Sequence, residues 1–160
     1  MKLMNKRFSR RFASYLSKGD VRRLFYDVLV KKYGSVEAAS RAAGISRKTP
    51  YNLDTVRDVR HSTKVKVLQA AYEADPLSTL RFLVKALRSR AGEALFTLID
   101  YIKTEALRCR DSREVERHAR LLEEILEELG GPLRDEVEIE AEDAYQLLSQ
   151  KSAKLKAGEQ

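Results

Sequence analysis

Residues 36–53 read VEAASRAAGISRKTPYNL, and this stretch decides how the N-terminal half of the chain is expected to fold. Ser35 is a suitable N-cap for a short helix over 36–43, and Ser46 is a suitable cap for a second helix. Gly44 lies between them and supplies the positive φ that a tight turn requires. Two short helices joined through a glycine at this spacing predict a helix-turn-helix arrangement.

The segment resembles the helix-turn-helix DNA-binding domains of bacterial enhancer-binding activators and, more loosely, those of the lactose-repressor type. Such families need small residues where the two helices cross, and this chain has Ala39, Ser40 and Ala43 there. Ile45 and Leu53 stand where these families place apolar residues that face the core. The resemblance implies an N-terminal helical bundle that binds double-stranded DNA.

Pro50 departs from the family pattern, because such families usually carry a branched apolar residue at this position. If Ser46 caps the second helix, Pro50 is its fourth residue, so one hydrogen bond is lost and Thr49 is pushed away from helical angles. If Thr49 is the cap, Pro50 is the favoured first residue, and the later start rotates the outward face of the helix. We favour the first interpretation, which predicts a recognition helix over about 46–56.

The outward face of this recognition helix carries side chains suited to the major groove. Arg and Lys bond to guanine O6 and N7, Asn bonds to adenine N6 and N7, and a tyrosine can reach a phosphate or a thymine methyl group. The base-facing candidates are Arg47, Lys48, Tyr51 and Asn52. Half or more of the hydrogen bonds in such interfaces go to phosphates. The phosphate-contacting candidates are Ser46, Thr49, Lys6, Arg7, Arg10, Arg11, Arg22 and Arg23.

Charge is distributed unevenly along the 160 residues, which carry 31 basic and 24 acidic side chains. Residues 1–72 hold 17 Lys or Arg and 5 Asp or Glu, a net +12, whereas residues 111–160 hold 7 and 14, a net −7. A basic first half suits a polyanion such as nucleic acid, because each phosphate that a cation neutralises releases counterions. A merely solvated, charge-rich surface has a similar composition, so charge alone does not identify the partner.

Apolar residues recur at helical spacing almost everywhere, and 21 Leu outnumber the 16 Val and Ile, which predicts an all-α fold. Besides the two helices of the motif, three helices are expected in the first half. The first covers 6–17 and is closed by Gly19, and the second begins after the cap Asp20 and ends at Gly34. The third covers 64–74 and begins after a cap at Ser62 or Thr63.

The second half is expected to be a long-helix dimerisation region. Asp75 and Pro76 predict a helix start, and one apolar stripe continues to about residue 109, where Cys109 ends it. We expect one long helix there, bent near 89–92, with two helices as the alternative. A capping-box-like start at Asp111 then begins a helix whose apolar residues form a heptad seam.

The end of the chain is harder to interpret from its residues. Gly130 and Gly131 should stop the seam helix, and 133–148 is either a strand around Val137 and Ile139 or, as we prefer, a helix from about Asp135. The last residues, 151–160, have little to bury and should form a mobile tail.

The predicted domains are therefore a helix-turn-helix DNA-binding domain over 1–75, a helical dimerisation domain over 76–150 and the tail over 151–160. The resemblance implies a sequence-specific DNA-binding protein, in particular a transcriptional regulator. We expect a homodimer, because a single recognition helix contacts too few base pairs for tight selection. The alternatives are a helical protein that binds protein partners or RNA, or an architectural DNA-binding protein without catalytic activity.

Other classes of protein are not expected from this sequence. The chain contains no GxxxxGK[ST], GxSxG, HExxH or GxGxxG, so we predict neither an enzyme nor a bound cofactor. Cys109 is the single cysteine, and the two histidines, His61 and His118, lie too far apart for a local metal site.

No apolar run approaches the roughly 18 residues of a membrane span. The start also lacks the apolar h-region of a signal peptide, so we expect a cytoplasmic protein with no membrane partner.

Overall fold

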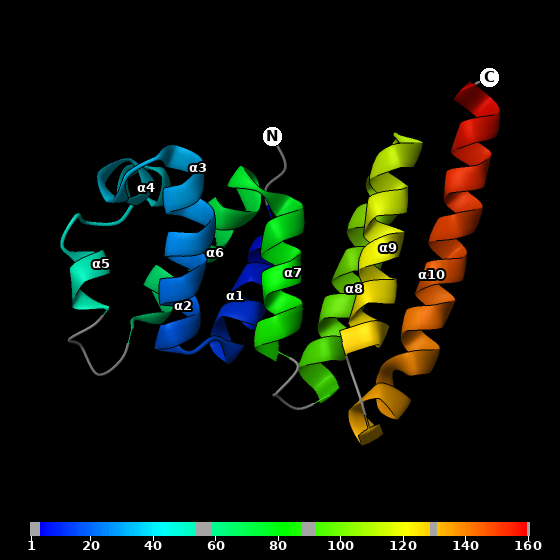
Figure 1. Ribbon diagram of the computed structural model, residues 1–160, viewed down its shortest axis with the longest axis horizontal. Helices are drawn as coiled ribbons and strands as arrows, with labels where there is room; N and C mark the ends of the chain where they lie inside the picture. Colours follow the sequence, from blue (N-terminus) through cyan, green and yellow to red (C-terminus); the bar gives the residue numbers. More distant parts are fainter. Residues whose placement is uncertain (1–3, 54–58, 88–91, 129–130, 160) are drawn as a thin grey trace. The chain divides into compact units, whose positions relative to one another are not determined.

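The computed structural model describes residues 4–53, 59–87, 92–128 and 131–159. No strand occurs in these ranges, and helices make up most of them, so the protein is all-α as its apolar spacing predicts. The chain divides into two compact units, Met1–Ala86 and Leu87–Gln160 (Figure 1). This division falls later in the chain than the predicted domain boundary after residue 75.

The first unit is arranged around one helix, α6 (His61–Ala74). This helix packs against four other elements, and its Val67, Leu68, Ala71 and Tyr72 are buried. The elements that pack on it are α1 (Lys6–Tyr15), α2 (Lys18–Leu24), the π-helix η1 (Phe25–Val30) and α4 (Val36–Ala43). The remaining elements are α3 (Lys31–Tyr33), α5 (Thr49–Asn52) and α7 (Pro76–Leu87).

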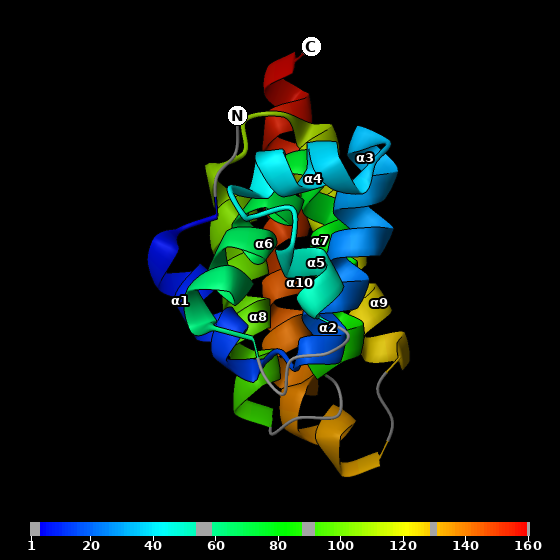
Figure 2. The same ribbon diagram turned by 90° about the vertical axis from the view of Figure 1, so that its left-hand side faces the viewer.

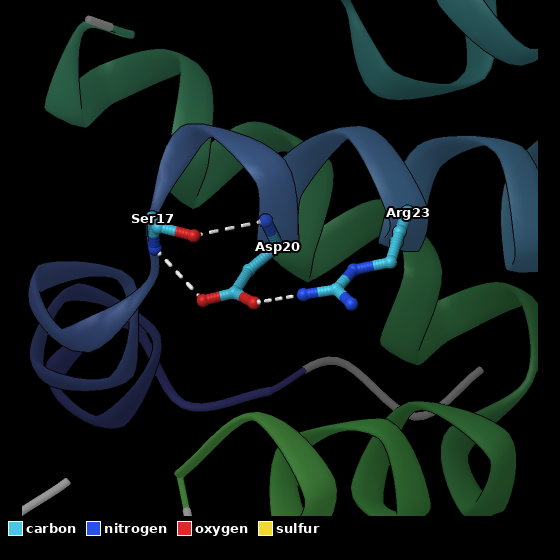
Figure 3. Close-up of polar contacts among 3 residues, drawn as sticks. All are labelled: Ser17, Asp20 and Arg23. Carbon is cyan, nitrogen blue, oxygen red and sulfur yellow. Dashed lines mark hydrogen bonds and ion pairs between the residues drawn. The ribbon is translucent and has the colours of Figure 1, made fainter. Parts of the chain in front are cut away.

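The chain passes from α1 into α2 through Leu16 and Ser17, which are both extended. Ser17 Oγ accepts a hydrogen bond from Asp20 N at 3.1 Å, and Asp20 Oδ2 accepts one from Ser17 N at 2.9 Å (Figure 3). These reciprocal bonds form a complete capping box. The predictions that Gly19 closes the first helix and that Asp20 is the cap of the second are therefore wrong, because the serine caps α2 three residues earlier.

Replacing Ser17 with alanine is expected to lower the free energy of unfolding by about 0.5–2 kcal/mol, since it removes an N-cap hydroxyl. Ser14→Ala is the matched control: Ser14 Oγ only donates to Arg11 O within α1 and is exposed. Urea denaturation followed by circular dichroism measures both changes. Equal losses from the two substitutions would contradict a capping role for Ser17.

The segment from α2 to α3 is one uninterrupted helical run that ends at Gly34, as predicted. Gly34 has φ +86°, a conformation that favours glycine. The middle of the run is the π-helix η1, which buries Phe25, Val28 and Leu29. The sequence did not indicate this widening, since Phe25, Val28 and Leu29 are spaced as on one face of an α-helix.

The starts of α6 and α7 differ in how well they were predicted. α6 begins before the expected caps Ser62 and Thr63, because the Arg60 carbonyl accepts the N–H groups of Thr63 and Lys64. Asp75 caps α7 as predicted, with its Oδ1 accepting from Ser78 N at 3.2 Å.

Over 77–109, where we expected one long helix with two helices as the alternative, the structure describes two helical elements. These are α7, which ends at Leu87, and α8 (Gly92–Arg108), which lies in the second unit. The bend predicted near 89–92 falls largely outside the described residues.

The second unit is built from three helices: α8, α9 (Ser112–Glu128) and α10 (Gly131–Glu159). Each of the three packs against the other two, and Figure 1 shows them side by side. Asp111 Oδ1 accepts from Arg113 N at 3.0 Å, which confirms the predicted start of α9. The fully buried core residues include Leu95, Leu98 and Ile102 of α8, Val115, Leu122 and Ile125 of α9, and Val137, Ala141 and Leu148 of α10.

The end of the chain differs most from its prediction. α10 begins at Gly131, before the expected start at Asp135, and continues to Glu159, so residues 151–159 of the predicted tail are helical. The helix that we preferred over 133–148 is confirmed, and the strand alternative around Val137 is wrong. Three contacts hold the last turns of α10: Lys151 Nζ donates to Leu107 O, Ser152 Oγ donates to Glu116 Oε1 at 3.2 Å, and Lys156 pairs with Glu116.

Because α10 packs along α9, the predicted heptad seam is covered within the chain. Of the predicted seam, Val115, Ala119 and Leu122 are buried, so these side chains are not available to a second subunit. Leu126 is half-buried, and Leu129 lies outside the described residues. No helix in the described parts of the chain is both long and apolar enough to cross a membrane.

Candidate nucleic-acid interface

The candidate interface begins with α4, which is capped at both ends as the sequence predicts. Ser35 Oγ accepts a hydrogen bond from Ala38 N at 3.1 Å. Gly44 follows the helix with φ +69°, and Ile45 N donates to Ser40 O at 3.0 Å. This pattern of a left-handed glycine and a backward hydrogen bond ends a helix sharply and redirects the chain.

The small residues of α4 are buried, in agreement with the need for close helix packing. Ala39 and Ser40 are fully buried and Ala43 is nearly so. The Ser40 hydroxyl donates to Val36 O at 2.7 Å, which satisfies it inside the helix. The helices that α4 packs against are α3, η1 and α6.

The proposed recognition helix is shorter than predicted. Its described part, α5, comprises Thr49–Asn52. The segment 54–58, which holds the last three residues of the predicted 46–56, lies outside the described residues.

Neither interpretation of Pro50 matches the structure fully. Ser46 behaves as a cap, as we favoured: its Oγ accepts from Lys48 N at 3.2 Å and its carbonyl accepts from Thr49 N at 3.0 Å. Regular α-helix nevertheless begins only at Thr49, which makes Pro50 the second helical residue. Proline has no N–H to continue the hydrogen-bond ladder, so the turn before it remains tighter than an α-helix.

The segment 46–53 has one buried side and one exposed side. Pro50 and Leu53 are buried, so proline fills the apolar position that a branched residue occupies in the resembled families. Arg47, Lys48 and Asn52 are exposed, and the Tyr51 side chain is 67% exposed. The structure thus brings the four predicted base-facing residues together on one accessible stretch.

An ion pair crosses the turn between α4 and α5. Arg47 Nη1 lies 3.1 Å from Glu37 Oε1, and the two side chains are 74% and 57% exposed. The pair ties the first outward residue after the turn to the preceding helix. Sequence reasoning missed Glu37 because its partner lies ten residues away, beyond the i,i+4 spacing that identifies ion pairs within a helix.

A second group of cations lies on α1, where Lys6, Arg7, Arg10 and Arg11 are all exposed. The opposite side of α1 buries Ser9, Phe12 and Ala13, and Gln69 Nε2 of α6 donates to Ser9 Oγ at 3.1 Å. Both views of the ribbon show α1 apart from α5 (Figure 1 and Figure 2). The structure therefore separates these four cations from the base-facing candidates.

The last two phosphate-contacting candidates, Arg22 and Arg23, lie on α2 and have partners within the protein. The Arg22 guanidinium is 5.2 Å from the centroid of the Tyr26 ring, a cation–π distance. Arg23 Nη2 donates to Asp20 Oδ1 at 2.9 Å (Figure 3). A phosphate at this position would share Arg23 with the capping box of α2.

The two units differ in charge. Residues 1–86 carry 19 Lys or Arg and 7 Asp or Glu, a net +12, whereas residues 87–160 carry 12 and 17, a net −5. The unit that contains the α4–α5 turn is thus the basic one. Within the described ranges, no group of three or more His, Cys, Asp or Glu side chains is placed to hold a metal ion.

His118 and Cys109 are both buried in the second unit. The His118 ring places Nδ1 at 2.7 Å from Glu114 O, one turn earlier in α9. Comparisons with protein-family models, curated protein sequences and solved structures find no match for this chain.

Proposed function

We propose that the first unit binds double-stranded DNA and places the exposed side of residues 46–52 in the major groove. The observation that carries the proposal is the exposure of Arg47, Lys48, Tyr51 and Asn52 directly after a left-handed glycine turn, on a segment anchored by a buried Leu53. These side-chain types match the hydrogen-bonding groups at the major-groove edges of guanine and adenine.

The charge of the first unit supports the same proposal. A net charge of +12 on one compact unit attracts the phosphate backbone and favours binding through release of counterions. The exposed cations of α1 would then contact phosphates at some distance from the base contacts, in a positioning role.

We also propose that the protein acts as a homodimeric regulator on an inverted repeat, since two recognition segments are needed for tight selection. With most of the described seam of α9 covered by α10, the large apolar side chains that are exposed in the described part of the second unit are Phe96, Leu107, Ile139 and Leu147. Sedimentation equilibrium of the full chain checks this point. A mass that stays at the 18.3 kDa of one chain at all concentrations would contradict the dimer.

Footprinting on fragmented genomic DNA tests the proposed function directly. A discrete protected site supports a sequence-specific regulator, whereas uniform protection supports an architectural role. Binding to structured RNA or to a protein, with no DNA binding, would replace the proposal by its alternative.

Replacing Arg10 and Arg11 together with alanine is expected to weaken binding to all DNA sequences alike. Loss of two phosphate contacts should reduce the slope of log affinity against log salt by about two units. Anisotropy titrations at several salt concentrations give the slope. Arg113→Ala with Arg117→Ala is the matched control, because both side chains are exposed on α9 of the acidic unit. An unchanged slope in the α1 variant would place α1 away from the DNA.

A further inference from the structure

The ion pair between Glu37 and Arg47 joins an acidic side chain to one of the four proposed base-facing residues. Glu37 lies in the first turn of α4, and Arg47 follows the left-handed turn at Gly44. Arg47 Nη1 donates to Glu37 Oε1 at 3.1 Å, and this bond engages one of the five N–H groups of the guanidinium. The Arg47 side chain remains 74% exposed, so a ligand can still reach the guanidinium.

Acidic residues are uncommon in this part of the chain. Residues 1–53 carry 13 Lys or Arg but only three Asp or Glu, which are Asp20, Asp27 and Glu37. Asp20 belongs to the capping box of α2, and Asp27 lies on η1. Within the described residues 4–53, Glu37 is thus the acidic side chain that reaches across the turn between α4 and α5.

Glu37 also has a cation close by on its own helix. Arg41 lies four residues further along α4, which is the spacing at which oppositely charged side chains on a helix can meet. Arg41 is exposed, yet the ion pair that the structure describes for Glu37 joins it to Arg47, ten residues away. The carboxylate is therefore directed across the turn rather than along α4.

The Glu37 carboxylate makes the two kinds of acceptor on DNA unequal for Arg47. A phosphate that bonds to this guanidinium brings its negative charge within a few ångströms of the carboxylate, and like charges at such a distance repel each other. Guanine O6 and N7 also accept hydrogen bonds from arginine, but a guanine base carries no net charge. Specificity is a difference between two affinities, so an interaction that weakens the phosphate contact favours the base contact.

We propose that Glu37 is a specificity-determining residue of the DNA-binding surface, which opposes contact between Arg47 and phosphates and so favours contact between Arg47 and a guanine edge. The inference rests on the proposed function, because it requires that residues 46–52 enter the major groove. Glu37 contacts no base in this arrangement. It acts through Arg47 and is therefore a positioning residue.

Replacing Glu37 with glutamine tests the inference, since this change removes the charge and keeps the length of the side chain. Affinity for a duplex that lacks the preferred site is expected to rise about 2- to 5-fold, the range typical of an exposed charge interaction. The slope of log affinity against log salt should steepen by about one unit, because Arg47 gains a phosphate contact. Affinity for the preferred site should rise less, so the ratio of the two affinities falls. Anisotropy titrations with both duplexes measure this ratio.

Asp27→Asn is the matched control, because it also removes one negative charge from an exposed side chain of the first unit, on η1. This variant should raise both affinities alike through the general charge of the unit and leave their ratio unchanged. Both substitutions are at exposed positions, so the unfolding midpoints should stay close to that of the unaltered protein.

A double-mutant cycle shows whether Glu37 acts through Arg47. In a protein that already carries Arg47→Ala, adding Glu37→Gln should leave the affinity ratio unchanged. The inference is overturned if Glu37→Gln alone leaves the ratio unchanged, or if it lowers the ratio equally with and without the Arg47 side chain. Either result would leave the proposed DNA binding standing, whereas an unaltered protein that prefers no duplex overturns both.

Discussion

Replacing Asn52 with alanine is expected to weaken binding to the preferred DNA site by about 5- to 150-fold and to relax selection at one base pair. This range corresponds to the loss of a bidentate contact with adenine, about 1–3 kcal/mol. The salt slope should not change, because no phosphate contact is lost. Competition binding with DNA substituted at each position identifies the base pair that loses discrimination.

Two comparisons make this result interpretable. Asn52 is exposed, so Asn52→Ala should leave the unfolding midpoint nearly unchanged. Arg41→Ala is the matched control, because Arg41 is exposed on α4 and lies outside residues 46–52. This variant should keep its selectivity among DNA sequences. If single alanine substitutions of Arg47, Lys48, Tyr51 and Asn52 all leave specific binding intact, the recognition segment lies elsewhere. If the unaltered protein prefers no sequence, the proposed regulator function itself fails.

Replacing Leu148 with alanine is expected to lower the free energy of unfolding of the second unit by about 2–5 kcal/mol. Leu148 is fully buried where α10 packs on the other two helices, and truncation there leaves a cavity as well as removing apolar contacts. Leu147→Ala is a closely matched control, since the neighbouring leucine is 41% exposed and should cost well under half as much.

Urea denaturation with circular dichroism detects both changes. Because the chain has two compact units, the unfolding curve is best analysed with separate transitions for each. Equal destabilisation by the two substitutions would mean that α10 does not pack through this face.

The parts of the fold that the sequence predicted well are those determined by neighbouring residues. The caps of α4, the left-handed Gly44 and the start of α7 at Asp75 all rest on hydrogen bonds between residues at most five positions apart. Asp20 shows the limit of this approach. Both Ser17 and Asp20 are good caps, and only the reciprocal bond between them shows which one begins the helix.

The mispredictions in the second unit depend on contacts between distant residues. The last turns of α10 contain few apolar residues, so their sequence did not indicate any packing. Lys151 nevertheless hydrogen-bonds to Leu107 and Ser152 to Glu116, which lie 44 and 36 positions earlier in the chain. The same helix covers the seam of α9, from which a second subunit had been inferred. In the candidate interface, the four outward residues could be predicted from helix spacing, whereas the Glu37–Arg47 pair could not.

Because Glu116 holds the end of α10, the stability of this end should depend on pH. The hydrogen bond from Lys156 lowers the folded-state pKa of Glu116, so the contribution of this carboxyl to stability is fully present above the ordinary glutamate pKa of about 4.3 and is lost as pH falls through the lowered value. Protonation would remove the ion pair with Lys156 and weaken the hydrogen bond from Ser152 at the same oxygen atom. Acid should therefore weaken the attachment of the last turns of α10, and the unit should take up a proton as these contacts are lost.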